Sequence, residues 1–160
     1  MNTLRAAAVI TAAITSGLTA GLLFGWACSV MPGLARTDDR TFVGAFQAMD
    51  RAIMNPWFFV VFVGAVVLPG LAAVLHLGSD HRPVLLWTLA ALALSLATVA
   101  ITRVVHLPLN AAVQAAGDPA QITDIGAVRT RFEARWVRWH LVRTATSTAA
   151  FTCLILATRS

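Results

Sequence analysis

The stretch Arg135-Trp-Val-Arg-Trp-His-Leu-Val-Arg-Thr144 opens the last long apolar segment of the chain. At about 100° per residue of an α-helix, four side chains of this segment fall within about 60° of one another: Trp136, His140, Arg143 and Ser147. An indole, an imidazole, a guanidinium and a hydroxyl therefore form one stripe on an apolar helix. Because ionisable groups are costly inside a membrane, this stripe either serves a site or holds the fold together.

The composition around this segment is that of a membrane protein. Of the 160 residues, 58% are hydrophobic and 12% are charged, whereas soluble domains have roughly 45–50% apolar and about 25% charged residues. The mean hydropathy is +0.76. Four long apolar stretches account for the excess, so the sequence predicts an all-α membrane protein with a single domain over residues 1–160.

We expect an antiparallel bundle of four transmembrane helices, with an amphipathic helix at the interface between the first two. The spans are predicted at about 4–30, 55–77, 84–107 and 137–157, and the interfacial helix at about 38–53. Pro32 is expected to end the first span, and Pro108 to break or bend the third. The last helix is expected to begin near Asp124, with its first turns outside the hydrocarbon.

The arginines predict the orientation in the membrane. The chain has no lysine and a net charge of +5. Arg5, Arg82 and Arg159 lie on the side of the two termini, and all other arginines lie on the opposite side. The positive-inside rule places these Arg-rich connections in the cytoplasm and both termini outside. Since the arginines flank or enter apolar segments, they indicate membrane anchoring and buried pairing and not nucleic-acid binding.

Small residues recur every four positions in the first span, at Ala13, Gly17, Gly21 and Gly25. Such a ridge lets another helix approach closely. The partner is either another span of the same chain or a second copy, so a homo-oligomer assembled through the three glycines is one of the expected forms.

The predicted topology brings polar residues from distant segments to one mouth of the bundle, on the Arg-rich side. The residues expected there are Asp50, Asn55, Trp57, Arg103, His106, Asn110, Trp136, Trp139, His140 and Arg143. Apolar walls with a few converging polar groups are the usual form of a small-molecule site. The sequence therefore predicts a polar pocket in contact with the lipid bilayer that binds a hydrophobic small molecule.

The ionisable residues of this pocket each have two interpretations. Arg143 is either a clamp for an anion or oxyanion, or a structural partner of Asp50 or of backbone carbonyls freed by Pro108. His140 and His106 are either a base and acid pair or hydrogen-bonded interfacial side chains. A third interpretation makes the two histidines metal ligands, with Asp50 or Asp124 completing an iron site, although no spacing demands it.

The remaining candidates are amides, indoles and one further arginine. Asn110 and Asn55 either orient a substrate carbonyl or cap the helix ends beside the neighbouring prolines. Trp136 shares a face with the catalytic candidates and is the better aromatic wall, whereas Trp57 also suits the interface belt. Arg103 is expected to share one helical face with Asn110.

Five motifs follow one another along nearly the whole chain: Met31–Arg36, Asp39–Phe42, Asp50–Phe58, Leu107–Asn110 and Arg135–Thr144. In this order they resemble the DUF1772 family of membrane proteins, also called the anthrone oxygenase-like family. The resemblance implies a four-span membrane bundle. Some members, from polyketide pathways, oxidise an anthrone to an anthraquinone with molecular oxygen, so it also implies an oxygenase or oxidoreductase acting on a small, hydrophobic, aromatic substrate.

If the activity carries over, His140 or His106 is the base for the acidic methylene of the anthrone. Arg143 is then the partner of the resulting anion, Trp136 stacks on the flat substrate, and no cofactor is required. The family is expected to have Asn where Asp50, His106 and His140 stand, so this chain adds titratable groups. Two alternatives stay open: a non-enzymatic structural or accessory bundle, and a metal-dependent oxidoreductase that holds iron or copper through His106 and His140.

Overall fold

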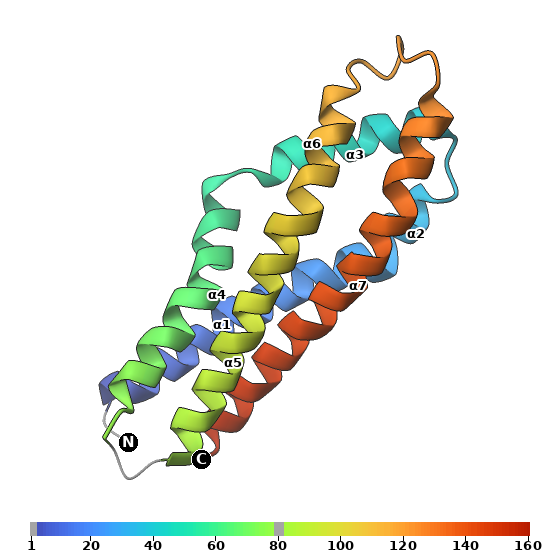
Figure 1. Ribbon diagram of the computed structural model, residues 1–160. Coiled ribbons are helices and arrows are strands. Elements are labelled where there is room, and N and C mark those ends of the chain that lie inside the picture. The colour runs from blue at the N-terminus through green and yellow to red at the C-terminus, as the bar shows by residue number, and fades with distance from the viewer. Residues whose placement is uncertain (1–2, 79–81) are drawn as a thin grey trace.

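The computed structural model describes residues 3–78 and 82–160, and in this part of the chain every regular element is a helix (Figure 1). The first long helix runs through α1 (Thr3–Gly25), the π-helical turn η1 (Trp26–Val30) and α2 (Met31–Leu34). The short helix α3 (Asp39–Ile53) and the second long helix α4 (Pro56–Leu75) follow. The third long helix consists of α5 (Arg82–Ile101), the π-helical turn η2 (Thr102–His106) and α6 (Leu107–Ala115), and the fourth is α7 (Ile125–Thr158).

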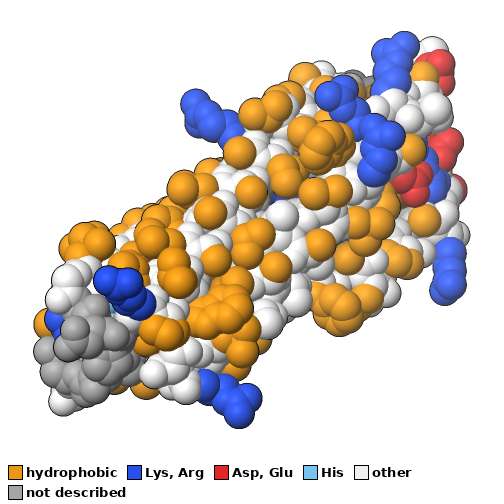
Figure 2. All heavy atoms as spheres, turned by 60° about the horizontal axis from the view of Figure 1, so that its bottom comes forward, with side chains coloured by type: hydrophobic (Ala, Val, Ile, Leu, Met, Phe, Trp, Pro, Cys, Tyr) orange, Lys and Arg blue, Asp and Glu red, His pale blue; other side chains and the backbone are white. Residues whose placement is uncertain are grey.

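All four long helices are long and apolar enough to cross a membrane. Helix α4 has 20 residues, which matches a hydrocarbon core of about 30 Å at about 1.5 Å per residue. The other three extend past α4 on the side of α3, and Figure 2 shows acidic side chains and several arginines gathered at one end of the molecule. The chain is therefore an integral, multi-pass membrane protein, as predicted; which side faces the cytoplasm stays a prediction.

Two prolines that were predicted to interrupt helices do not do so. Pro32 lies within the first long helix, which continues to Leu34, and Pro108 lies within the third, which continues to Ala115. In a regular α-helix, a proline removes one hydrogen bond and its ring crowds the carbonyl four residues earlier. The prediction of a break was wrong because a π-helical turn precedes each proline.

Each π-helical turn closes with a wider hydrogen bond than an α-helical turn. In η1 the N–H of Met31 donates to the carbonyl of Trp26, and in η2 the N–H of Leu107 donates to the carbonyl of Thr102. The turn therefore contains one extra residue and makes room for the proline ring that follows. The extra residue also changes which side chains face the bundle interior beyond it.

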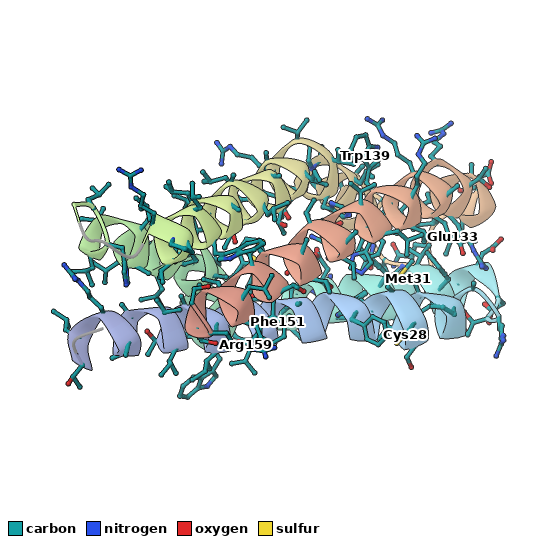
Figure 3. The ribbon with its side chains drawn as sticks, turned by 90° about the horizontal axis from the view of Figure 1, so that it is seen from below. Cys28, Met31, Glu133, Trp139, Phe151 and Arg159 are labelled. Carbon is teal, nitrogen blue, oxygen red and sulfur yellow. The ribbon has the colours of Figure 1, made fainter. Side chains whose placement is uncertain are left out.

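The helices pack closely in the half of the bundle that lies away from α3. A Cβ atom added to Gly17 would lie 3.0 Å from the ring of Phe151, which Figure 3 shows between α7 and α1. Gly17 is therefore used for packing within the chain. Gly21 and Gly25 have open space beside them, and assembly of two copies through this ridge stays a prediction.

Helix α3 lies across the end of the bundle (Figure 1). The side chain of Asp38 caps its start by accepting the N–H groups of Arg40 and Thr41. The hydroxyl of Thr41 also donates to this carboxylate and, with the backbone bonds, lowers the pKa of Asp38. Further along, the buried amide of Gln47 donates to the carbonyl of Val113 at 2.8 Å. These contacts hold α3 as a cover over the site described below.

Arg129 of α7 fastens the connection between α2 and α3. Its guanidinium donates to the carbonyls of Thr37 at 2.9 Å and Ala35 at 3.0 Å. It also pairs with Asp39 at 3.0 Å and with Glu133 at 2.7 Å. The side chain of Arg129 is 15% exposed, whereas its partner Asp39 is 45% exposed, so water competes more for the pair with Asp39 than for the bond to the carbonyl of Thr37.

We predict that Arg129→Met lowers the free energy of unfolding by roughly 2–4 kcal/mol, because two carbonyls and two carboxylates lose a charged donor. Denaturant or thermal unfolding of the purified protein in detergent measures the change. The control is Arg135→Met, which removes an exposed arginine of the same helix and should change stability by less than about 0.5 kcal/mol. Equal stability of the two variants would show that Arg129 does not fasten this connection.

Candidate functional site

The stripe predicted on α7 lies in the interior of the bundle. Trp136, His140 and Ser147 are buried, and Arg143 is half-buried beside them. The helical spacing of these residues therefore does place them on one inward face. Their contacts show what each side chain is free to do.

Both ring nitrogens of His140 are occupied. Its Nε2 lies 2.9 Å from the carbonyl oxygen of Leu23 on α1, and its Nδ1 lies 3.0 Å from Nε of Arg143. Because a carbonyl only accepts and a guanidinium only donates, these partners assign a neutral ring with its proton on Nε2. The ring also stacks on Trp136, with centroids 4.6 Å apart and planes 13° apart. His140 therefore positions its neighbours and has no free lone pair.

Arg143 is held without a carboxylate partner. Its Nη1 donates to the hydroxyl of Thr102 at 3.2 Å, and its guanidinium carbon lies 5.4 Å from the centre of the Trp136 ring. The ion pairs within residues 3–78 and 82–160 are those of Arg129, so Arg143 does not pair with Asp50. Guanidinium has five N–H donors, and those not used for His140 and Thr102 leave Arg143 with capacity to bind an anion.

A second chain of hydrogen bonds joins α7, α6 and α3. The indole N–H of Trp136 donates to Oδ1 of Asn110 at 2.9 Å, and Nδ2 of Asn110 donates to Oδ1 of Asp50 at 2.6 Å. The other carboxylate oxygen of Asp50 accepts from Gln114 at 2.9 Å. Asn110 therefore connects the three helices and does not cap a helix end. The network also holds both oxygens of Asp50.

His106 differs from His140 because one of its nitrogens is unused. Its Nδ1 lies 3.4 Å from the carbonyl of Ile101, and its buried Nε2 has no hydrogen-bond partner in the described part of the chain. The Ile101 carbonyl can accept only from a protonated Nδ1, and in that tautomer Nε2 keeps its lone pair. The ring meets Trp136 edge to face at 5.1 Å. A buried polar atom without a partner is uncommon in native proteins and calls for an explanation.

His106 borders a cavity of about 200 Å³ between α1, α3, α4, η2, α6 and α7. The polar residues that line it are Asp50, Thr102, His106, Asn110 and Arg143. The aromatic residues that line it are Trp26, Phe46, Phe58, Phe59, Phe62 and Trp136. A dry cavity of about 150 Å³ is known to bind benzene, so this one has room for a small aromatic molecule.

Two of the predicted binding residues lie beside the cavity and not in its wall. Asn55 caps α4 by accepting the N–H of Phe58 at 3.1 Å. Trp57 is 82% exposed on the outer surface, where the interface belt of a membrane protein is expected. Both residues line a groove between α1 and α4 that shares five lining residues with the cavity: Leu22, Leu23, Ile53, Phe58 and Phe62.

Arg103 also lies outside the cavity. It was predicted to share a helical face with His106 and Asn110, but its side chain is exposed and Thr102 lines the cavity instead. That prediction extended a regular α-helix through this segment, whereas the π-helical turn η2 contains an extra residue and rotates Arg103 outward.

Sequence reasoning missed Trp26 and Thr102 as cavity residues. Each begins a π-helical turn and lies six positions before a proline. Trp26 packs at 5.7 Å from Trp136 and at 6.1 Å from Phe46, measured between ring centroids. The equal spacing from the two prolines was the signal in the sequence that could have found both residues.

The described residues contain no group of three His, Cys, Asp or Glu side chains placed to hold a metal ion. His140 uses both nitrogens, and Asp124, one of the expected carboxylates, caps α7 by accepting the N–H of Ala127 at 3.0 Å. The residues present therefore do not form the two-His-one-carboxylate arrangement considered from the sequence.

Comparison with known proteins gives a family match and no closer relative. The sequence matches the family described as anthrone oxygenase over residues 57–153, which is more than half of the 160-residue chain. No curated protein and no solved structure matches the chain. The matched region contains His106, Asn110, Trp136 and Arg143, whereas Asp50 precedes it.

The hydrogen bond between Trp136 and Asn110 can be tested by a double-mutant cycle. We predict that Trp136→Phe and Asn110→Ala are non-additive, with a coupling of roughly 0.5–3 kcal/mol in the free energy of unfolding, because either change removes the same bond. The matched control combines Asn110→Ala with Trp139→Phe, which alters the next tryptophan of α7 and should be additive. Additivity in both cycles would refute the bond.

Proposed function

The chain belongs to the anthrone oxygenase family, and from this premise we propose that it is a membrane-embedded oxygenase acting on a small, hydrophobic, anthrone-like aromatic substrate. The observation that carries the proposal is that His106, whose buried Nε2 has no partner among the described residues, lines the same cavity as Arg143. A free base and a cation border one aromatic-lined space. This combination suits removal of a proton from carbon followed by stabilisation of the anion.

The first step proposed is proton transfer to His106. The methylene of an anthrone lies between two aromatic rings and opposite a carbonyl, so the negative charge left by proton loss spreads onto the carbonyl oxygen. Nε2 of His106 accepts the proton. The spare N–H donors of Arg143 bind the developing oxyanion, and the rings of Trp136 and Trp26 pack against the flat substrate.

The remaining steps need only molecular oxygen. The substrate anion reduces O₂ and forms a carbon–oxygen bond at the former methylene, which gives a hydroperoxide. Loss of the second methylene proton and cleavage of the oxygen–oxygen bond then yield the new carbonyl and one water. The substrate loses four electrons, and O₂ gains four, so no further reductant or cofactor is required.

His106 is a better base than the other two candidates. Both nitrogens of His140 are engaged, with Leu23 and with Arg143. Both oxygens of Asp50 accept amide hydrogens. The role proposed for His140 is to position Arg143 and Trp136, and that proposed for Asp50 and Asn110 is to hold the indole of Trp136 in place.

We predict that His106→Ala lowers kcat by at least about 10²-fold, because the reaction loses its general base. Arg143→Met is expected to lower kcat by about 10²–10³-fold through loss of the oxyanion partner. The measurement is anthraquinone formation with matched oxygen uptake, using purified protein and an anthrone. Arg103→Met is the control, since this arginine is exposed outside the cavity.

Wild-type turnover in folded His106→Ala would overturn the base assignment. Absence of turnover of any anthrone by the wild-type protein would instead favour a structural or accessory bundle. Size-exclusion elution and helical circular dichroism establish that each variant is folded before its rate is interpreted.

We further predict that chelation leaves the turnover unchanged, because the proposed steps use only side chains and oxygen. Protein purified without a polyhistidine tag is treated with a strong chelator and analysed for iron and copper. Stoichiometric metal, with activity lost on chelation and restored by that metal, would support the alternative of a metal-dependent oxidoreductase.

A further inference from the structure

The cavity reaches the outer surface of the bundle at an apolar rim. Four hydrophobic residues that line it are also exposed on the outside: Leu22 by 38%, Met54 by 56%, Phe59 by 45% and Leu107 by 46%. A side chain that lines a cavity and is exposed marks the place where the cavity meets the surface. Met54, Phe59 and Leu107 form the rim, at the end of α3, the start of α4 and the start of α6, and α4 and the third helix are neighbours in the bundle (Figure 1). Leu22 lies on α1, beside the groove between α1 and α4.

The rim lies at the edge of the hydrocarbon core. Helix α4 begins at Pro56 and is as long as the core is thick. Phe59 therefore lies about 5 Å inside the boundary, at about 1.5 Å per residue. The exposed Trp57 is close to the same boundary, which is the depth preferred by interfacial tryptophans. An opening at this depth faces the junction between acyl chains and headgroups.

Helix α3 and a groove between α1 and α4 border the other sides of the cavity. Helix α3 covers the end of the bundle, with Phe46 and Gln47 buried. A groove between α1 and α4 shares lining residues with the cavity, Leu23 and Phe62 among them. Leu23 is buried, whereas Leu22, which also lines both spaces, is 38% exposed. The groove is therefore the competing route, and the test below separates it from the rim. An aqueous route would also have to pass the hydrogen-bonded amides that surround Asp50.

We propose that the substrate enters and leaves the cavity directly from the membrane, through an opening between α4 and the η2–α6 segment, with Phe59 and Leu107 as its gate. The identity of the substrate rests on the proposed function, but the opening does not. The occupant is a flat apolar molecule dissolved in the bilayer near the headgroups. Leu107 controls how fast this molecule passes and not how tightly it binds.

The test uses Leu107→Phe, which narrows the opening, and Leu107→Ala, which widens it. The matched control is Val104→Phe on the same segment, because Val104 is 71% exposed and does not line the cavity. The probe is anthracene, which has the three fused rings of an anthrone but no reactive methylene. It is delivered from lipid vesicles to the full chain in bilayers, and binding is followed by energy transfer from the tryptophans.

We expect Leu107→Phe to slow both association and dissociation roughly 5–10-fold, and Leu107→Ala to accelerate both, with the equilibrium constant within about twofold of wild type. Val104→Phe should behave as wild type. Parallel change of the two rates is the signature of a gate. A residue that merely forms the wall of the binding site would alter dissociation and affinity and leave association unchanged.

Unchanged association in Leu107→Phe overturns the proposal, as does a failure of anthracene to bind the wild type. Slower association in Leu22→Phe but not in Leu107→Phe also overturns it and assigns the route to the groove between α1 and α4. The proposed oxygenase function fails separately. It fails if anthrone is not turned over while anthracene still binds at the expected rates. Anthracene has no reactive methylene, so its binding rates report entry and exit alone.

Discussion

The pairing of Arg143 with a neutral imidazole is the interaction on which the site depends. A guanidinium inside a membrane bundle needs hydrogen-bond partners, and a carboxylate would satisfy it but would also cancel its charge. Here His140 accepts from Arg143 and donates to the Leu23 carbonyl of α1. The cation is therefore fixed in direction and keeps its charge for a ligand. Asp50, the nearby carboxylate, is occupied by Asn110 and Gln114.

The two halves of the bundle serve different purposes. Away from α3, small side chains such as Gly17 let the helices pack closely. Towards α3, large rings separate the helices and leave the cavity among them. Helix α7 passes through both halves, so the rigid packing of its later turns fixes the position of Trp136 and His140. A site for an apolar ligand at the membrane boundary is supported by the packed half below it.

Local sequence patterns predicted the fold and half of the site. Apolar length predicted the four spans, Asn55 caps α4 as one of its two interpretations had it, and the spacing from Trp136 to Arg143 predicted the buried face of α7. The patterns failed where a contact depends on a distant backbone atom. The carbonyl of Leu23 binds Nε2 of His140. Because Leu23 is far from His140 in the sequence, no local pattern predicts this bond. Similarly, regular α-helical spacing could not reveal the π-helical turn that turns Arg103 outward.

The two π-helical turns also separate the part of a helix that packs in the membrane from the part that lines the cavity. One extra residue rotates the segment that follows by about 100° relative to a continuous α-helix. In the third long helix, the pattern that faces lipid and neighbouring spans before Thr102 is therefore out of phase with the pattern that faces the cavity after it. Substitutions in α5 that suit a different bilayer need not change the residues of α6 that line the cavity. Substitutions in α6 likewise need not change how α5 packs in the membrane. A long helix thereby behaves as two modules that can vary independently.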